Sequence, residues 1–567
     1  MKKNANIDIL NFKENDTVTL YGWAQTIRKM GSFNFVDLRD RSGIVQLIFN
    51  NKIDFSKESV LKITGILKKR KNPNPNLKTG NWEIEVSSYE VLSRSIDIPF
   101  EIKDDILAKE EIRLEYRFLD LRRPKMYENL LLRHKIIKVV RDWFDKNGFL
   151  EIETPILSKS TPEGARDYLV PTRNNGKFFA LPQSPQLYKQ LLMISGIEKY
   201  FQISRAFRDE DMRKDRQPEF TQLDVEMSFI NEDDIFSLME DLYKNIMKLI
   251  NIDISTPFRK ITYDEAVDLY GSDKPDLRYE YKLIDLTKYL ASSNSPLFQN
   301  HQSIKGVIFD QLLSNKDIKI LEEIALKNKT DKLITIKIQN KNFNSNTLND
   351  LISLELKQII DDFNIEDATL LITRGEYKNV TQSLGAVRVK LNELFNLANE
   401  DKYEFAWIID WPMFELDENN QIVSAHHPFT APTDETIKYL DNDPLKVKAR
   451  SYDLVLNGFE LSSGSIRIHD KDLQIKMFKV LNLCDQDINN KFGFFINAFQ
   501  YGVPPHGGLA FGIDRLVMIL AKESSIREVI AFPKNANGID VMLDSPSRIS
   551  DEQLKELNIK QIDSNKK

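Results

Sequence analysis

The chain has 567 residues, of which 41% are hydrophobic and 29% charged, and its 79 basic and 85 acidic residues give a net charge of −6. This length predicts three to four domains, and the composition excludes a wholly disordered chain or a membrane bundle. The single cysteine, Cys484, excludes an intramolecular disulfide framework and cysteine-based zinc or iron–sulfur sites. Because no apolar run approaches the ~18 residues of a spanning helix, we expect a cytoplasmic protein without a membrane partner.

The first hundred residues predict a small β domain. Apolar and polar residues alternate in five short segments, separated by turn signals such as Asp40–Gly43, at 17–23, 33–39, 44–49, 60–67 and 82–86. Five strands with basic loops favour an oligonucleotide-binding barrel, with a five-stranded sandwich as the alternative. Residues 1–100 carry 16 basic and 11 acidic residues, and 61–80 carry six basic and no acidic ones. The net negative total therefore hides a basic domain suited to nucleic acid.

The rest of the chain predicts a hinge at 101–127 and a larger interrupted domain. A helix is expected from Asn129 to Asn147, and alternating strands and helices continue through 128–274. Residues 275–405 are rich in Asn, Lys, Asp and Ile and contain no catalytic constellation, so we interpret them as an inserted domain. The main domain resumes over 406–550, and 551–567 form a polar tail.

A charged loop between two predicted strands contains the first candidate functional residues. The strands are 201–207 and 220–226, and spacing of two places Arg208 and Glu210 on one face as the first strand ends. Arginine can fork onto a phosphate, a carboxylate can accept from an exocyclic amine, and Phe220 offers a stacking surface. A solvated charged hairpin is the alternative. Neither the P-loop nor the dinucleotide-binding glycine motif occurs in the sequence.

Two further motifs accompany this loop. In His506–Arg515, small residues precede Arg515, which is expected to begin a helix over 516–521, and Thr154-Pro155 follows a predicted strand at 149–153. The three stretches together resemble the signature motifs of class II aminoacyl-tRNA synthetases, in the order of that family and behind a barrel, as in subclass b. The segments 161–168, 183–190, 208–220 and 426–430 resemble those of bacterial-type aspartyl-tRNA synthetases.

The resemblance implies a multidomain α+β fold: a five-stranded OB-fold barrel, a catalytic domain built on an antiparallel sheet, and an inserted α+β domain. It implies activation of L-aspartate with ATP, transfer of the aspartyl group to tRNA(Asp), and a homodimer. Whether tRNA(Asn) is a second acceptor depends on anticodon contacts near Lys29 and Met30. The alternatives are a related ligase for asparagine or lysine, and a catalytically inactive tRNA-binding regulator.

The resemblance also implies roles for individual residues. Arg208 and Arg515 would be catalytic, and ATP would be bound by Arg208, Asp209, Glu210, Gln217, Phe220, Glu460, Gly512, Ile513, Asp514 and Arg515. Aspartate would be bound by Glu163, Gln186, Lys189, Arg208, Asp224, His426 and Arg467. The tRNA anticodon would be contacted by Arg28, Phe35, Gln46 and Glu83.

Asp453 and Glu460 are the residues that the resemblance implies for Mg²⁺, a hard ion that prefers oxygen ligands. Their separation of seven would put them on opposite faces of a regular strand, so they need a helix or a bend to converge. Asn457-Gly458 supplies the bend. Residues 461–464 are less glycine-rich than is usual in the family, so the backbone beside Glu460 is expected to differ.

Overall fold

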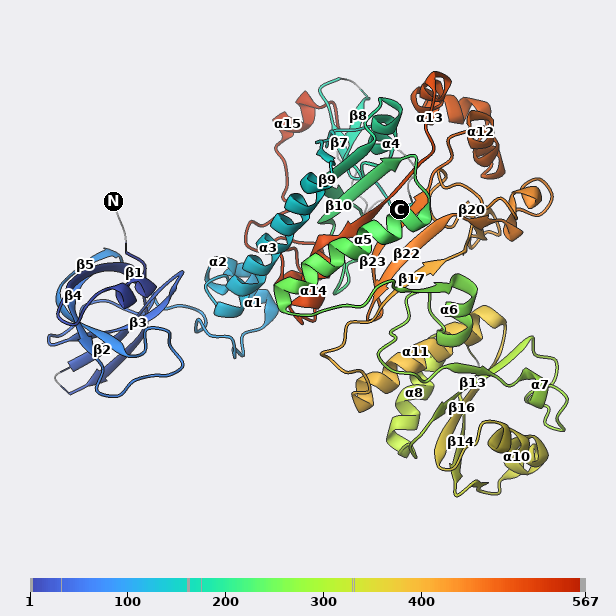
Figure 1. Ribbon diagram of the computed structural model, residues 1–567, viewed down its shortest axis with the longest axis horizontal. Coiled ribbons are helices and arrows are strands. Elements are labelled where there is room, and N and C mark those ends of the chain that lie inside the picture. The colour runs from blue at the N-terminus through green and yellow to red at the C-terminus, as the bar shows by residue number, and fades with distance from the viewer. Residues whose placement is uncertain are drawn as a thin grey trace. The chain divides into compact units, whose positions relative to one another are not determined.

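The computed structural model describes residues 4–31, 33–160, 164–174, 176–328, 330 and 332–560 (Figure 1). The chain divides into two compact units. One consists of Met1–Glu128 with the short segments Ala531–Asn535 and Ile539–Pro546, and the other contains the remainder. No helix of the described residues is long and apolar enough to cross a membrane.

The first unit contains a closed five-stranded barrel, which confirms the predicted OB-fold and excludes the sandwich. The strand order is β1-β2-β3-β5-β4, with β1 (Thr17–Met30), β2 (Phe33–Asp40), β3 (Gly43–Phe49), β4 (Val60–Lys69) and β5 (Trp82–Ser93). Alternation buries one face of each strand, as Val36 and Leu38 illustrate. A Cβ added at Gly22 would lie 2.4 Å from the carbonyl oxygen of Arg39, so a glycine is needed where β1 approaches β2. β5 runs beyond the predicted 82–86 because β4 pairs with it along its length through two register shifts.

After the barrel, the first unit contains α1 (Glu110–Glu115) and α2 (Arg117–Asp120). The carboxylate of Asp120 is fully buried and holds this segment together. It accepts hydrogen bonds from Arg117 at 2.5 Å and Arg123 at 2.8 Å, and Arg113 lies 3.4 Å away. These charge-assisted contacts explain how an arginine-rich segment forms an ordered structure.

The second unit is built on an eight-stranded sheet of order β11-β17-β22-β23-β24-β10-β9-β6. The six central strands are antiparallel to one another, and β11 and β6 join the edges in parallel with β17 and β9. The bounds are β6 (Leu150–Glu151), β9 (Lys199–Phe207), β10 (Glu219–Ser228), β11 (Arg259–Thr262), β17 (Phe405–Ile409), β22 (Ser451–Leu456), β23 (Phe459–Ile466) and β24 (His506–Gly512). This antiparallel sheet confirms the expected class of catalytic domain.

Helices and short hairpins surround the sheet. The helices are α3 (Pro124–Lys146), α4 (Gln186–Ile194), α5 (Glu232–Met247), α6 (Tyr263–Tyr270), α12 (Lys471–Val480), α13 (Asp485–Ala498), α14 (Ile513–Leu520) and α15 (Asp551–Glu556). The hairpins pair β7 (Leu169–Pro171) with β8 (Phe178–Ala180), β18 (Trp411–Pro412) with β21 (Lys448–Ala449), and β19 (Phe414–Leu416) with β20 (Ile422–Ser424). α3 begins before the predicted Asn129, because proline is favoured in the first helical turn.

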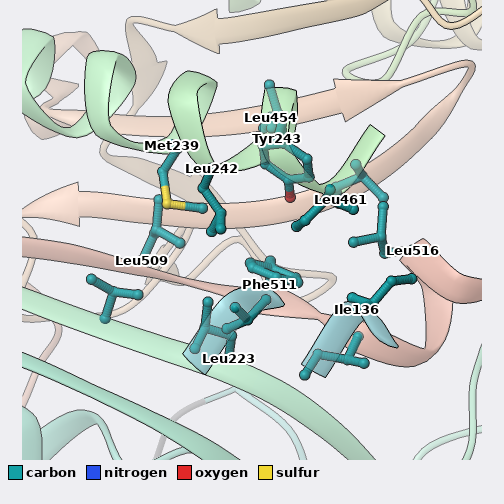
Figure 2. Packing of buried hydrophobic residues seen from close by; sticks show 14 of the residues in the cluster. Ile136, Leu223, Met239, Leu242, Tyr243, Leu454, Leu461, Leu509, Phe511 and Leu516 are labelled. Carbon is teal, nitrogen blue, oxygen red and sulfur yellow. The ribbon is translucent and has the colours of Figure 1, made fainter. Parts of the chain in front are cut away.

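The main core lies between one face of this sheet and the helices that cover it. Leu223 and Phe511 from adjacent strands face Met239 and Leu242 of α5, and Leu516 of α14 closes the side (Figure 2). All five side chains are at most 1% exposed. At about 1.5–3 kcal/mol for each fully buried side chain, this layer stabilises the strands whose opposite face carries the polar site.

Between α6 and β17 the chain forms a second, smaller sheet of order β12-β13-β16-β14-β15. Its strands are β12 (Leu283–Asp285), β13 (Ser303–Phe309), β14 (Ile334–Gln339), β15 (Asn342–Phe343) and β16 (Ala368–Gly375). Its helices are α7 (Thr287–Leu290), α8 (Asn315–Lys327), α9 (Thr347–Leu351), α10 (Ser353–Asp362) and α11 (Tyr377–Phe395). Two hydrophobic clusters, one on each face of this sheet, give the segment cores separate from that of the eight-stranded sheet.

Candidate active site

A cavity of about 370 Å³ lies over the polar face of the eight-stranded sheet. Its walls come from segments far apart in the chain: α4, the loop between β9 and β10, the loop before Thr430, β23, β24 and the start of α14. Most of the predicted ATP- and aspartate-binding residues line it, namely Gln186, Lys189, Arg208, Glu210, Gln217, Phe220, Asp224, His426, Glu460, Arg467, Gly512, Asp514 and Arg515.

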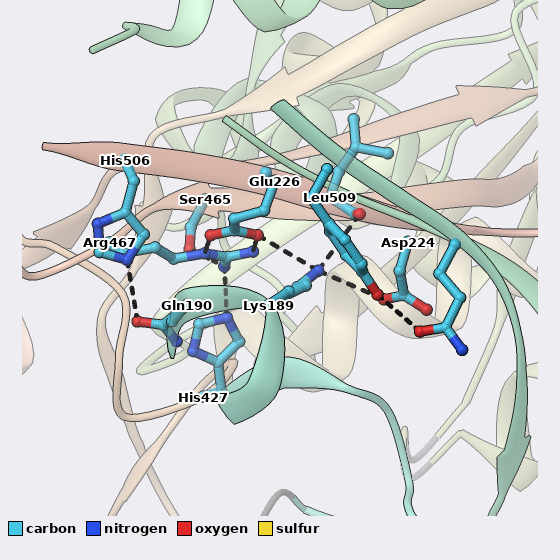
Figure 3. Close-up of polar contacts among 12 residues, drawn as sticks. Lys189, Gln190, Asp224, Glu226, His427, Ser465, Arg467, His506 and Leu509 are labelled. Atoms are coloured by element: carbon cyan, nitrogen blue, oxygen red, sulfur yellow. Dashed lines mark hydrogen bonds and ion pairs between the residues drawn. The ribbon is translucent and has the colours of Figure 1, made fainter. Parts of the chain in front are cut away.

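Two cations and two carboxylates meet at one end of this cavity (Figure 3). Asp224 and Glu226 share a face of β10 because they are two residues apart. The Nζ of Lys189 lies 3.4 Å from Asp224 and 3.5 Å from Glu226, while Arg467 donates to Glu226 from Nε at 2.9 Å and from Nη2 at 3.1 Å. All four residues are at most 1% exposed. Their formal charges cancel, which is the condition for burying so many ionised groups together.

The hydrogen-bonding partners of these groups fix their orientation. Asp224 accepts from Ser204 at 2.6 Å and from Gln222 at 2.9 Å. The remaining arm of Arg467, Nη1, donates to Ser465 at 2.6 Å and lies 2.7 Å from Nε2 of His427. These contacts orient the charged groups without a bound substrate.

The electrostatics of the cluster follow from burial and from these pairs. Burial alone would raise the pKa of Glu226, but the charges of Arg467 and Lys189 overcome it and hold that pKa below its ordinary value. Burial lowers the pKa of His426 to about 4, and burial together with Arg467 lowers the pKa of His427 well below its usual value. Both histidines are therefore neutral near pH 7, and His427 can accept from Arg467.

A glycine allows the close approach of β24 to this cluster. A Cβ added at Gly508 would lie 2.0 Å from the carbonyl oxygen of Val225 and 2.2 Å from a carboxylate oxygen of Glu226. A glycine is therefore required at position 508 for β24 to pack against β10.

The other end of the cavity combines aromatic and cationic groups. The guanidinium of Arg208 lies 5.1 Å from the ring centroid of Phe220. Across the cavity Arg515 contacts Asp215 at 3.2 Å and the carbonyl of Glu460, and its Nε is buried without a partner among the described residues. A planar group between Phe220 and Arg515 would gain both stacking and cation–π contact.

Several predicted residues lie elsewhere or have structural contacts as well. Asp209 pairs with Arg166 at 3.8 Å and Ile513 is fully buried in the core, and neither lines the cavity. Asp514 reaches the cavity edge, but its carboxylate also accepts from the backbone of Thr221 at 2.8 Å and from Arg133 of α3. The predicted residue Glu163 lies outside the described residues.

Asp453 and Glu460 share a face through a hairpin. Asn457 and Gly458 have left-handed backbones, φ 51° and 84°, and join β22 to β23. The register shifts at Leu461, because Leu454 pairs with Ser462 while Val455 pairs with Glu460. The two-residue turn places Glu460 directly opposite Val455, which is two residues from Asp453 on β22, so both carboxylates lie on one side of the hairpin; the bulge at Leu461 follows this pair.

The same pair has properties that suit a cation. Burial raises the pKa of Asp453 well above its ordinary value and the charge of Glu460 raises it further, while Oδ1 of Asp453 is buried with no hydrogen-bond partner among the described residues. In the described part of the chain, no group of three or more His, Cys, Asp or Glu side chains could hold a metal ion. Two carboxylates fit an ion that completes its coordination with phosphate and water oxygens, as Mg²⁺ does.

The predicted anticodon residues gather on one side of the barrel. Gln46 donates to Glu83 at 2.9 Å and accepts from Arg28 at 3.3 Å, and Arg28 also pairs with Asp37 at 3.0 Å. Phe35 is half-buried on the same face of β2 as Asp37. The structure adds Arg70, which donates to Gln46 at 3.0 Å.

Sequence reasoning missed two residues that contact Arg467. Glu226 and His427 both contact Arg467, yet the sequence-based interpretation gave them no role. The spacing of two between Asp224 and Glu226 could have indicated a shared strand face. No local pattern could have indicated that Arg467, 241 residues later, meets Glu226.

Comparison with known proteins agrees with this geometry. Residues 109–536 match the family model described as class II tRNA synthetases (D, K and N), and residues 18–92 match that of the OB-fold nucleic acid binding domain. The fold and the site therefore define a class II aminoacyl-tRNA synthetase.

Two similar proteins indicate the family within this class. The chain is 47% identical to the aspartate–tRNA ligase of Malacoplasma penetrans, over 96% of both chains. It is also 47% identical to the aspartate–tRNA(Asp/Asn) ligase of Thermoanaerobacter sp., over 96% of this chain and 95% of that protein. The chain belongs to the aspartate–tRNA ligase family, as its motifs predicted.

Solved structures share the fold at lower identity. Asparaginyl-tRNA synthetase from Pyrococcus horikoshii aligns with a TM-score of 0.59 and 20% identity, over 94% of this chain and 98% of that one. Aspartyl-tRNA synthetase from Entamoeba histolytica aligns with a TM-score of 0.58 and 20% identity, over 94% and 92%.

Proposed function

We propose that the chain activates L-aspartate with ATP and transfers the aspartyl group to the 3′ end of tRNA(Asp). An oxygen of the aspartate α-carboxylate attacks the α-phosphorus of ATP, giving aspartyl-adenylate and releasing pyrophosphate. A hydroxyl of the terminal tRNA ribose then attacks the carbonyl carbon, loses its proton and releases AMP. Neither step needs a protein nucleophile, so positioning and charge neutralisation carry the catalysis.

The charge balance at Lys189, Asp224, Glu226 and Arg467 is the observation that supports this proposal. The ammonium group of aspartate would pair with Asp224, with Gln186 beside it. The two cations would then have only Glu226 as a counter-charge, which leaves one positive charge for the side-chain carboxylate of the substrate. The amide of asparagine would leave that charge buried and unmatched, a mismatch that gives discrimination of ~10⁴–10⁵.

The other end of the cavity suits ATP. Arg208 would bind the α-phosphate and the reacting carboxylate, and Phe220 and Arg515 would hold the adenine between them. Glu210 and Gln217 line the same cavity and would contribute to nucleotide recognition, while His426 would close the aspartate side. Asp453 and Glu460 would hold Mg²⁺, which supplies charge neutralisation at the phosphates when it is bound.

Pyrophosphate exchange tests the activation step. We expect exchange of labelled pyrophosphate into ATP with aspartate, and neither with asparagine nor with lysine. Exchange with asparagine or lysine instead would refute the specificity. No exchange with any of the three would favour a tRNA-binding regulator.

The barrel face around Gln46 supports tRNA as the acceptor, because a stacking ring, Phe35, lies beside paired cations and amides. Met30, 64% exposed at the end of β1, adjoins this face. Charging purified tRNA(Asp) and tRNA(Asn) separately tests the acceptor, and equal charging of both would identify a ligase with two acceptors.

A homodimer is supported by exposed apolar side chains. α3, β6 and the β7–β8 hairpin, with the segment between them, present large residues to solvent: Leu131, Leu150, Ile156, Leu157, Leu169, Phe178 and Phe179. Burial of these exposed apolar side chains against a second copy would stabilise a dimer. Light scattering should give twice the chain mass, and Ile156→Glu should reduce it to that of one chain. A wild-type monomer at micromolar concentration would refute the dimer.

A further inference from the structure

The turn between the two candidate metal ligands is held from outside the eight-stranded sheet. Asn457 and Gly458 form this turn, and Asn457 is only 7% exposed. Its Oδ1 accepts from the backbone N–H of Glu404 at 2.9 Å, and its Nδ2 donates to the carbonyl of Lys402 at 2.8 Å. Residues 402–404 are the stretch by which the chain returns from the smaller sheet to β17.

The stretch by which the chain leaves α6 for the smaller sheet also lies against this turn. A Cβ added at Gly458 would lie 3.3 Å from the Cβ of Asp276, in the stretch by which the chain leaves α6 for the smaller sheet. The carboxylate of Asp276 accepts from Arg278 at 3.0 and 2.8 Å, and Arg278 also lies 3.8 Å from Glu400 in the return stretch. The outgoing and returning crossings are thus linked to each other and to the turn.

A buried arginine fastens the outgoing crossing to α11. Arg388 is 2% exposed and donates to the carbonyls of Asp276 at 2.7 Å, Tyr279 at 2.8 Å and Tyr281 at 3.0 Å. Its guanidinium also lies 4.1 Å from the ring centroid of Tyr279. A charged fork that is satisfied by backbone carbonyls fixes the path of the chain and leaves little freedom for the turn that rests on it.

We propose that the segment 275–405 positions the β22–β23 turn and thereby sets the placement of Asp453 and Glu460, with Asn457 as the positioning residue. The inference rests on the proposed cation role of those two carboxylates. Because β22 and β23 pair from this two-residue turn onward, a rotation at Asn457 shifts the pairing of Val455 with Glu460 and with it the placement of Glu460 relative to Asp453. Geometry set by such outer contacts is a known determinant of metal affinity.

Asn457→Gly tests the proposal, since glycine keeps the left-handed backbone and removes only the two side-chain hydrogen bonds. Asn420→Gly is the matched control, because Asn420 is also left-handed, φ 57°, in the exposed turn between β19 and β20. The Mg²⁺ concentration for half-maximal pyrophosphate exchange should rise by up to about tenfold in Asn457→Gly, because Asn457 acts through the hairpin and its side chain contacts neither carboxylate, and tenfold is the lower end for residues that contact a metal ligand directly. The KM for aspartate should stay within about twofold, and the control should match the wild type.

A binding measurement separates this inference from the proposed function. Electron paramagnetic resonance of free Mn²⁺, with ATP and without aspartate, should show a weaker protein-dependent site in Asn457→Gly. Arg388→Lys keeps the charge but loses the guanidinium hydrogen bonds to the three carbonyls. It should likewise raise the Mg²⁺ concentration for half-maximal exchange and weaken Mn²⁺ binding. If the wild type binds Mn²⁺ and both variants bind it equally well, the positioning role is refuted and the metal assignment stands. Equal increases in the Mg²⁺ requirement and in the KM for aspartate would also refute the positioning role. No protein-dependent Mn²⁺ site in the wild type would refute the metal assignment itself.

Discussion

Removal of Arg467 is the perturbation whose consequences the structure defines most fully. Arg467→Ala deletes both hydrogen bonds to Glu226 and leaves that carboxylate, 0% exposed, with Lys189 at 3.5 Å as its remaining cation. Removing one partner of a buried ion pair costs about 3–5 kcal/mol. At about 2 °C per kcal/mol for a domain of this size, the thermal midpoint should fall by about 6–10 °C.

In the same variant the use of aspartate should be impaired, while the affinity for ATP should be retained. A buried charge contact with substrate contributes about 3–4 kcal/mol, so kcat/KM for aspartate in pyrophosphate exchange should fall by roughly 10²–10³-fold. The affinity for ATP, measured by calorimetry, should change by less than about twofold, because Arg208 and Phe220 are untouched.

Two further variants serve as controls for the stability effect. Arg205→Ala removes a surface arginine with a 42% exposed side chain, paired with Glu219, and should shift the midpoint by less than about 2 °C. Adding Glu226→Gln to Arg467→Ala should recover part of the lost stability by removing the uncompensated carboxylate. A midpoint in Arg467→Ala no lower than that of Arg205→Ala would refute the reasoning about the buried pair, and loss of ATP binding would mean that Arg467 is misplaced.

Three other predictions follow from single features. Burial lowers the pKa of His426 to about 4, so between pH 6.5 and 4 the imidazole takes up a proton in the unfolded chain but not in the folded one, and the free energy of unfolding falls as the pH falls through this window. The thermal midpoint of His426→Gln should therefore fall less than that of the wild type between pH 6.5 and 4. Gly508→Ala should destabilise strongly because its Cβ would meet Glu226, whereas Gly493→Ala in open space on α13 should stabilise by up to about 1 kcal/mol, and equal midpoints for the two would contradict the packing argument. Phe35→Ala should raise the KM for tRNA by a factor equivalent to about 1–3 kcal/mol while pyrophosphate exchange is unchanged, and Phe363→Ala, at an exposed phenylalanine that follows α10, should alter neither.

Local patterns in the sequence were enough to predict the elements that bear the site. Alternation defined the barrel strands and the two strands on either side of the Arg208 loop, because burial of one strand face imposes a period of two. Asn457-Gly458 predicted a bend, since both residue types accept a left-handed backbone, and the structure places a two-residue turn there. The order of the motifs was sufficient to assign the family.

Contacts between distant segments decided what those elements do together. Glu226 neutralises Arg467 across 241 residues. Asn457 is held by the backbone at 402–404, more than 50 residues before it. The physical reason is that a local pattern records which face of a strand is buried, whereas the charge opposite that face and the register of its neighbour are fixed only when the sheet assembles.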